Sequence, residues 1–137
     1  MKLLLVDDEP VALRFLSGVL AGRARTETAP DGASAVAAFA RALDQGEPFD
    51  AVILDIMMPG MDGIEAARRI RALERGRGRE GACRLLMLSC LDGAEHQMAA
   101  QYDAGADGYL TKPVDSADLL AALANLGLPE NPLDGAE

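Results

Sequence analysis

The 137-residue chain has no long hydrophobic run, and it contains only two cysteines and one histidine. No apolar segment approaches the roughly 18 residues of a membrane-spanning helix. The apolar residues after Met1 stop at Asp7, which is too early for a secretory signal peptide. We therefore expect a cytoplasmic protein with no membrane insertion.

So few cysteines and histidines argue against a disulfide, a zinc site and a hydrolytic triad. Cys83 and Cys90 flank a predicted strand, in which about 3.3 Å per residue places them roughly 23 Å apart, far beyond disulfide reach. Two cysteines and His96 do not make up a zinc site. Nothing in the sequence places His96 beside Ser89, as a Ser-His-Asp hydrolase requires. We expect two reduced thiols and a solvated histidine.

Basic residues are also in short supply, with 13 Lys and Arg against 22 Asp and Glu and a net charge of −9. A nucleic-acid groove needs a basic face to neutralise phosphates, so this balance argues against a nucleic-acid partner. Hydrophobic residues make up 50% of the chain and charged residues 26%, which is typical of a globular protein. At about 150 residues per domain, the length corresponds to one domain.

Short apolar runs alternate with longer helical patterns along the chain. The runs predict parallel strands at 2–6, 51–54, 85–88 and 108–110, and an edge strand at 24–29. The spacing of apolar residues predicts helices at 10–20, 33–43, 64–73 and 94–104, and a fifth after residue 116. Five alternations are typical of an α/β fold with a parallel sheet and helices on both faces.

The ends of these elements carry local signals. Pro10 suits a first helical turn, and Asp31 and Ser116 are the expected N-caps of the second and fifth helices. The apolar residues of the first helix are expected on one side: Val11, Ala12, Phe15, Leu16, Val19 and Leu20. Residues 76–81 are predicted to form a flexible surface loop. Residues 127–137 are predicted to form a short, flexible acidic tail after a domain of residues 1–126.

Polar residues with complementary chemistry follow four of the predicted strands. Ligands of an open parallel sheet bind outside the carboxyl ends of its strands. The candidates there are Asp7, Asp8 and Glu9 after the first strand, Asp55 after the third, Ser89 after the fourth and Lys112 after the last. Clustered carboxylates repel one another unless a cation lies among them, and such oxygens suit Mg²⁺. Lysine and serine complement phosphoryl oxygens. These residues alone predict a magnesium-assisted phosphoryl site.

Three motifs resemble those of the receiver domains of two-component response regulators. They are Val-Asp-Asp-Glu-Pro at 6–10, Leu-Asp-Ile-Met-Met-Pro-Gly-Met-Asp-Gly at 54–63 and Gly-Tyr-Leu-Thr-Lys-Pro at 108–113. Their order and spacing match over about residues 2–126. The resemblance implies a flavodoxin-like, doubly wound (βα)5 fold with five parallel strands in the order 2-1-3-4-5, like that of the chemotaxis receiver.

The resemblance also implies the roles of the reacting residues. Asp55 matches the phosphoacceptor, and Lys112 matches the ammonium that contacts the phosphoryl oxygens. Ser89 matches the switch hydroxyl and Tyr109 the aromatic switch residue, which turns inward when the hydroxyl moves. The peptide bond before Pro113 is expected to be cis.

The implied cofactor is Mg²⁺. Asp8 and Asp55 match its direct carboxylate ligands, Asp7 matches a ligand that acts through water, and Met57 matches a ligand through its backbone carbonyl.

As a receiver, the chain is expected to take a phosphoryl group from a histidine kinase or a histidine phosphotransfer protein. It would catalyse only its own phosphorylation and dephosphorylation. Because the chain stops soon after residue 126, we expect a single-domain regulator that signals to a separate protein through residues 94–126, as a monomer or weak dimer. Cys90 departs from the small alanine usual in the family, and its size is expected to narrow access to Asp55.

Four alternatives stay open at this point. As a receiver, the chain could instead pass its phosphoryl group on as a phosphorelay intermediate, or be excised from a larger kinase. A haloacid-dehalogenase-like phosphatase uses similar groups, but its nucleophile follows the first strand in an Asp-x-Asp pattern, whereas Asp55 follows the third. A flavodoxin-like redox carrier needs a hydroxyl- and glycine-rich loop where this chain has Asp7, Asp8 and Glu9. A docking module that never takes phosphate is disfavoured by the intact Asp55, Asp8 and Lys112.

Overall fold

A computed structural model describes residues 1–90 and 105–128. Its five parallel strands form one sheet in the order β2-β1-β3-β4-β5, which confirms the predicted fold and strand order. The strands are β1 (Lys2–Val6), β2 (Arg25–Ala29), β3 (Ala51–Asp55), β4 (Arg84–Ser89) and β5 (Gly108–Thr111). The position of β2 at one edge agrees with its exposed side chains.

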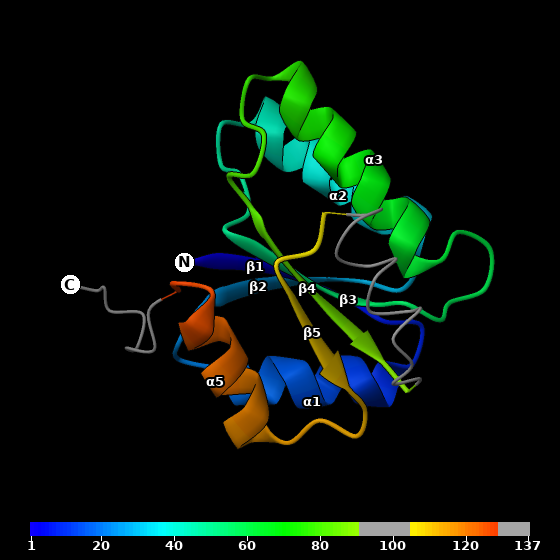
Figure 1. The fold of residues 1–137 in the computed structure, drawn as a ribbon, viewed down its shortest axis with the longest axis vertical. Helices are drawn as coiled ribbons and strands as arrows, with labels where there is room; N and C mark the ends of the chain where they lie inside the picture. Colours follow the sequence, from blue (N-terminus) through cyan, green and yellow to red (C-terminus); the bar gives the residue numbers. More distant parts are fainter. Residues whose placement is uncertain (91–104, 129–137) are drawn as a thin grey trace.

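In the described residues, four helices cover the two faces of the sheet. They are α1 (Pro10–Leu20), α2 (Gly32–Asp44), α3 (Gly63–Gly76) and α5 (Ser116–Asn125). Figure 1 shows α2 and α3 on one face and α1 and α5 on the other. The helix predicted at 94–104 and the solvated His96 lie outside the described residues, as does all but the start of the tail predicted at 127–137. Within 1–90 and 105–128, no helix has the length and apolar composition needed to cross a membrane.

Alternation along the central strands builds a separate core on each face of the sheet. In β1, Leu4 and Val6 pack with buried residues of α2 and α3, whereas Leu3 and Leu5 pack with buried residues of α1 and α5. Successive side chains of a strand point to opposite faces, so a strand that is apolar throughout is covered on both sides. The central strands are thereby packed between two cores, and their carboxyl ends lie at one edge of the sheet.

Two sequence predictions about helices need correction. Ser116 is the first residue of α5 rather than its N-cap, because the carboxylate of Asp115 accepts the hydrogen bond from the Asp118 backbone N–H at 2.7 Å. An ionised side chain at this position also complements the helix dipole. In α1, only part of the apolar stripe is core: Leu16 and Leu20 are buried, whereas Val11 is 68% and Phe15 41% exposed.

An ion-pair network in which Arg71 and Glu74 are buried ties α3 to the opposite, amino-terminal edge of the sheet. Arg71 contacts Glu74 at 2.7 Å and Asp107 at 2.8 Å, and it also donates to the Cys83 and Gly105 carbonyls. Glu74 in turn accepts from the backbone N–H groups of Cys83 and Gly81. The exposed 76–81 loop is therefore held to α3 through Glu74. Cys83 itself is buried and Cys90 exposed, and the two thiols are not bonded to each other.

Candidate functional site

Four neighbouring strands deliver the predicted site residues to one edge of the sheet. Asp7 and Asp8 follow β1, Asp55 ends β3, Ser89 ends β4, and Lys112 follows β5. The register places Asp55 opposite Leu88 and Ser89 opposite Thr111. The five residues therefore lie at the same level of the sheet although they are up to 105 positions apart in the sequence.

Lys112 is the cation of this site. Its Nζ atom lies 2.9 Å from Oδ2 of Asp7 and 3.4 Å from Oδ1 of Asp55. Burial alone lowers the pKa of the Lys112 ammonium, but the hydrogen bond to Asp7 and the charge of Asp55 outweigh it and raise that pKa. The ammonium is therefore held in its charged form beside both carboxylates.

Three carboxylates crowd around this single ammonium. Oxygen atoms of Asp7, Asp8 and Asp55 all lie within 4.8 Å of one another. Asp7 and Asp55 are buried, and the Glu9 backbone N–H donates to Asp7 at 3.0 Å. Burial and the charge of Asp7 raise the pKa of Asp55 to about 6, even though Lys112 acts in the opposite direction. The three carboxylates together carry more negative charge than the single Lys112 ammonium neutralises.

These residues fit a bound Mg²⁺. One ammonium faces three carboxylates, of which Asp8 is exposed and two are buried, and Mg²⁺ is commonly held by one or two carboxylates together with water. Asp7, Asp8 and Asp55 are the side chains that would hold the ion. The Met57 backbone carbonyl follows two residues after Asp55, on the loop that leads to α3, and its role as a ligand stays a prediction.

The raised pKa of Asp55 gives a pH-dependent stability in the absence of metal. The folded state binds this proton more tightly than the unfolded state, so its contribution is present at low pH and is lost as the pH rises from about 4 through 6. Asp55→Asn is expected to be more stable than the wild type at pH 8 in EDTA by about 1–2 kcal/mol, and the gain should shrink towards pH 5.

Urea denaturation at pH 5 and pH 8 measures this difference. Asp8→Asn is the matched control, because Asp8 belongs to the same site but is exposed, and its effect should be smaller at both values. A gain for Asp55→Asn that stays the same at the two pH values would contradict the assignment of the titration to Asp55.

The predicted switch residues lie on β4, which pairs with the strand of Asp55, and on β5 at the edge of the sheet. Ser89 is fully buried at the end of β4, and its carbonyl accepts a hydrogen bond from the Lys112 backbone N–H at 2.7 Å. Tyr109 is half-buried on β5 and packs against the core on the α2 and α3 face. The Lys112–Pro113 peptide bond is cis. Motion of Ser89 and Tyr109 stays a prediction.

Gly63 is a site-building residue that sequence reasoning did not find. It begins α3 directly over the backbone of Asp55, and its N–H donates to the Ile56 carbonyl at 2.9 Å. A Cβ atom here would overlap the Asp55 carbonyl oxygen and lie 2.8 Å from the Ile56 Cα. The Asp62-Gly63 pair indicates a helix start, but nothing in the neighbouring sequence indicates that the backbone at the end of β3 lies against Gly63.

Gly63→Ala is therefore expected to destabilise the fold by about 1–3 kcal/mol, because two backbone segments must separate to admit the methyl group. Urea denaturation measures the loss. Gly76→Ala, at the other end of α3, is the control, because a Cβ there meets nothing within 4 Å and alanine favours the helix. Equal stability of the two variants would show that the Gly63 contact is unimportant.

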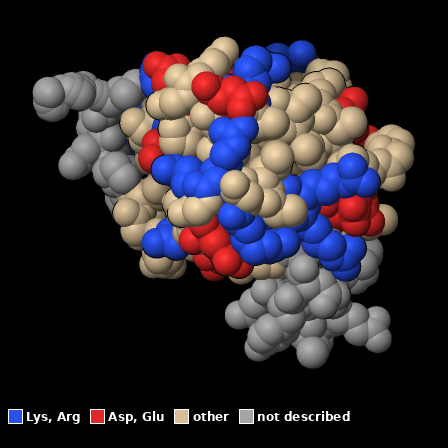
Figure 2. Space-filling model, turned by 90° about the horizontal axis from the view of Figure 1, so that it is seen from above, with Lys and Arg blue, Asp and Glu red and all other residues tan. Residues whose placement is uncertain are grey.

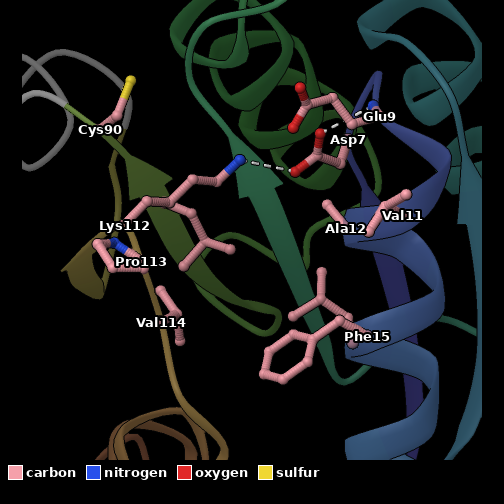
Figure 3. Close-up of a pocket in the computed structure, with 11 residues that line it drawn as sticks. Asp7, Glu9, Val11, Ala12, Phe15, Cys90, Lys112, Pro113 and Val114 are labelled. Carbon is pink, nitrogen blue, oxygen red and sulfur yellow. Dashed lines mark hydrogen bonds and ion pairs between the residues drawn. The ribbon is translucent and has the colours of Figure 1, made fainter.

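An apolar groove opens beside Lys112. Its volume is about 530 Å³, and its lining includes the exposed Val11 and Phe15 of α1 together with Pro113 and Val114. Figure 3 shows Phe15 facing Pro113 and Val114 across the groove, with Lys112 reaching over its upper end to Asp7. Cys90 lies at the rim on the Lys112 side. This groove explains why Val11 and Phe15 are not part of the core.

Comparison with known proteins assigns the family. The profile of the response regulator receiver domain matches residues 3–124. The chain belongs to this family. Receiver domains bind Mg²⁺ at an acidic pocket and interact with histidine kinases and downstream effectors. In the described part of this receiver, the carboxylates of Asp7, Asp8 and Asp55 form an acidic cluster.

The relatives differ in length from this chain. It is 37% identical over 127 residues to the transcriptional regulatory protein TcrA of Mycobacterium tuberculosis. The matched region covers 92% of this chain but 46% of TcrA. This receiver thus spans about half the length of the curated relatives that it matches.

Solved structures match over nearly their whole length. The chemotaxis protein CheY4 of Vibrio cholerae has a TM-score of 0.75 and 31% identity, covering 90% of this chain and 96% of that chain. The receiver domain of the histidine kinase CKI1 from Arabidopsis thaliana, solved with Mg²⁺ and BeF3⁻, has a TM-score of 0.78 and 26% identity and covers 92% and 89% of the two chains.

Proposed function

We propose that Asp55 of this receiver accepts a phosphoryl group from a histidine on a partner protein. The observation that carries the proposal is the placement of Asp55 between the Lys112 ammonium, 3.4 Å away, and the carboxylates of Asp7 and Asp8. A nucleophilic carboxylate, a cation for the phosphoryl oxygens and a magnesium-binding pair thereby meet at one point.

The chain's own residues divide the work of the transfer. An oxygen of ionised Asp55 attacks the phosphorus atom, the bond from phosphorus to the imidazole nitrogen breaks, and its electron pair stays on that nitrogen. Lys112 would leave Asp7 and turn towards the phosphoryl oxygens, whose charge its ammonium offsets. Bound Mg²⁺ would supply further positive charge to the same oxygens.

The donor docks beside the site in this proposal. A histidine must approach within bonding distance of Asp55, and the groove lined by Val11, Phe15, Pro113 and Val114 lies next to Lys112. Exposed apolar side chains rimmed by charge are typical of a protein-binding surface. They support a kinase or phosphotransfer protein as the donor, because a small phosphate ester needs no such surface.

The added phosphate is also the signal. It carries about −1.5 to −2 charges and favours a state that brings Lys112 and the Ser89 hydroxyl closer to Asp55. We propose that residues 94–126, which include Tyr109, respond and contact a separate protein.

Acetyl phosphate with Mg²⁺ tests the proposal. One phosphoryl group is expected to add to the wild type, seen as a single mass increase of the intact protein. Asp55→Asn should gain nothing, whereas Asp62→Asn, which retains an N-cap on the same loop, should label like the wild type. Labelling that persists in Asp55→Asn would overturn the assignment.

A further inference from the structure

Arginines gather on one face of this otherwise acidic molecule. Six of the chain's 13 basic residues lie between positions 68 and 79, although the net charge is −9. One of them, Arg71, is buried in the core network. The other five are exposed and form what we call the arginine face: Arg68, Arg69, Arg75, Arg77 and Arg79. Figure 2, which looks down on α2 and α3, shows more blue than red over this side of the molecule.

The acidic neighbours of this face neutralise it only in part. Glu65 is shared by Arg68 and Arg69, Glu80 lies 3.8 Å from Arg75, and Asp44 pairs with Arg77. All these pairs are exposed, and exposed pairs contribute little and exchange partners easily. Within the described part of the chain, Arg79 makes no ion pair. The face therefore keeps a net positive charge and guanidinium groups that can take new partners.

An apolar hollow adjoins the arginine face at the start of α3. Its volume is about 550 Å³, and Met57, Met61 and Ile64 supply apolar lining, whereas Asp62, Glu65, Arg68 and Arg69 supply charged lining. Met57 is 51% exposed. Methionine and arginine are both enriched at protein interfaces, the first because it adapts its shape and the second because its planar fork matches carboxylates.

These features favour a short acidic polypeptide over other polyanions. α3 has 14 residues and is about 21 Å long, so a longer duplex nucleic acid lying along it would extend beyond the arginine face of a chain whose net charge is −9. A single strand needs aromatic stacking platforms, and Phe39 and Phe49 are buried while Phe15 and Tyr109 lie on other elements. A membrane needs an apolar helix face, and that of α3 is packed on the sheet.

We propose that the arginine face and its apolar hollow bind an acidic segment of a partner protein that also supplies an apolar side chain. The segment's carboxylates pair with Arg75, Arg77 and Arg79, and its apolar side chain enters the hollow of Met57 and Ile64. This surface is distinct from the α1 groove and from residues 94–126. The printed ion pairs of the arginine face are with Glu65, Glu80 and Asp44 and not with Asp55, so we expect binding without a contribution from the Asp55 carboxylate.

Titration of the ¹⁵N-labelled chain with a 12-residue peptide of repeated Glu-Glu-Leu tests this proposal. Amide shifts are expected at residues 57–80, and the affinity should fall as salt is raised. Arg75→Glu with Arg79→Glu should weaken binding about tenfold. Arg14→Glu with Arg25→Glu makes the same change in net charge on other exposed elements and should have a much smaller effect.

Several results of these binding experiments would overturn the proposal. Absence of binding at low salt, equal losses in the two double variants, or shifts centred elsewhere would overturn it. Tighter binding of a 12-base-pair DNA duplex or of vesicles with anionic lipid would assign the face to another partner and overturn it as well. Asp55→Asn should bind the peptide like the wild type, so docking and phosphorylation fail independently.

Discussion

Replacing Arg71 with methionine is expected to lower the free energy of unfolding by about 3–5 kcal/mol. The guanidinium group contacts Glu74, Asp107 and two backbone carbonyls, and Glu74 is 1% exposed. Removing the cation leaves the buried Glu74 carboxylate without a partner of opposite charge. Loss of the guanidinium group should weaken the contact between α3 and the starts of β4 and β5.

Urea denaturation followed by circular dichroism measures this loss. Arg69→Met is the matched control, because Arg69 lies on the same helix but its ion pair with Glu65 is exposed, and its effect should stay within about 0.5 kcal/mol. Should Arg71→Met fail to fold, Glu74→Gln gives the milder test, since the amide can still accept from the Cys83 N–H. A loss below about 1 kcal/mol for Arg71→Met would contradict the account of the network.

Replacing Lys112 with methionine is expected to slow phosphorylation by acetyl phosphate about 10²- to 10³-fold. The ammonium is the one cation within reach of both Asp7 and Asp55 among the described residues. Without it the phosphoryl oxygens lose a partner, and the mutual repulsion of the carboxylates grows. The pKa of Asp55 should then rise further above about 6, because Lys112 is the group that lowers it.

The rate of phosphoprotein formation, followed by intact mass across pH 6–9, measures both effects. The variant should be phosphorylated more slowly, and the pH dependence of its rate should move to higher pH. Lys112→Arg is the control, since it keeps a positive charge at the same position and should recover part of the rate. A Lys112→Met variant that is phosphorylated at the wild-type rate would remove the ammonium from the mechanism.

The sheet and most of the site could be predicted because their signals are local. Runs such as Leu3–Leu5 are apolar on both faces, and this pattern indicates a strand that is covered on both sides. The residue after each parallel strand then lies at the carboxyl edge of the sheet. The sequence alone therefore predicts that Asp7, Asp55 and Lys112 lie close together. Their charges predicted a crowded acidic site, and the structure gives it one ammonium for three carboxylates.

Other features could not be predicted because they depend on contacts between distant segments. A charged residue in a helix normally faces solvent, and nothing near Arg71 indicates that Asp107 and Gly105 lie over it. Gly63 has the local pattern of a helix start, while its need for a bare Cα comes from the strand beneath it. The apolar spacing of α1 does not distinguish Leu16, which is core, from Phe15, which lines a groove.

The most direct test of the phosphorylation site is chemical trapping of the phosphoryl group. After reaction with acetyl phosphate and Mg²⁺, borohydride reduces an aspartyl phosphate to homoserine, and peptide mass spectrometry then locates the changed residue. Our account predicts homoserine at position 55 and unchanged aspartates at positions 7, 8 and 62. Homoserine at any of those three, with Asp55 intact, would contradict it.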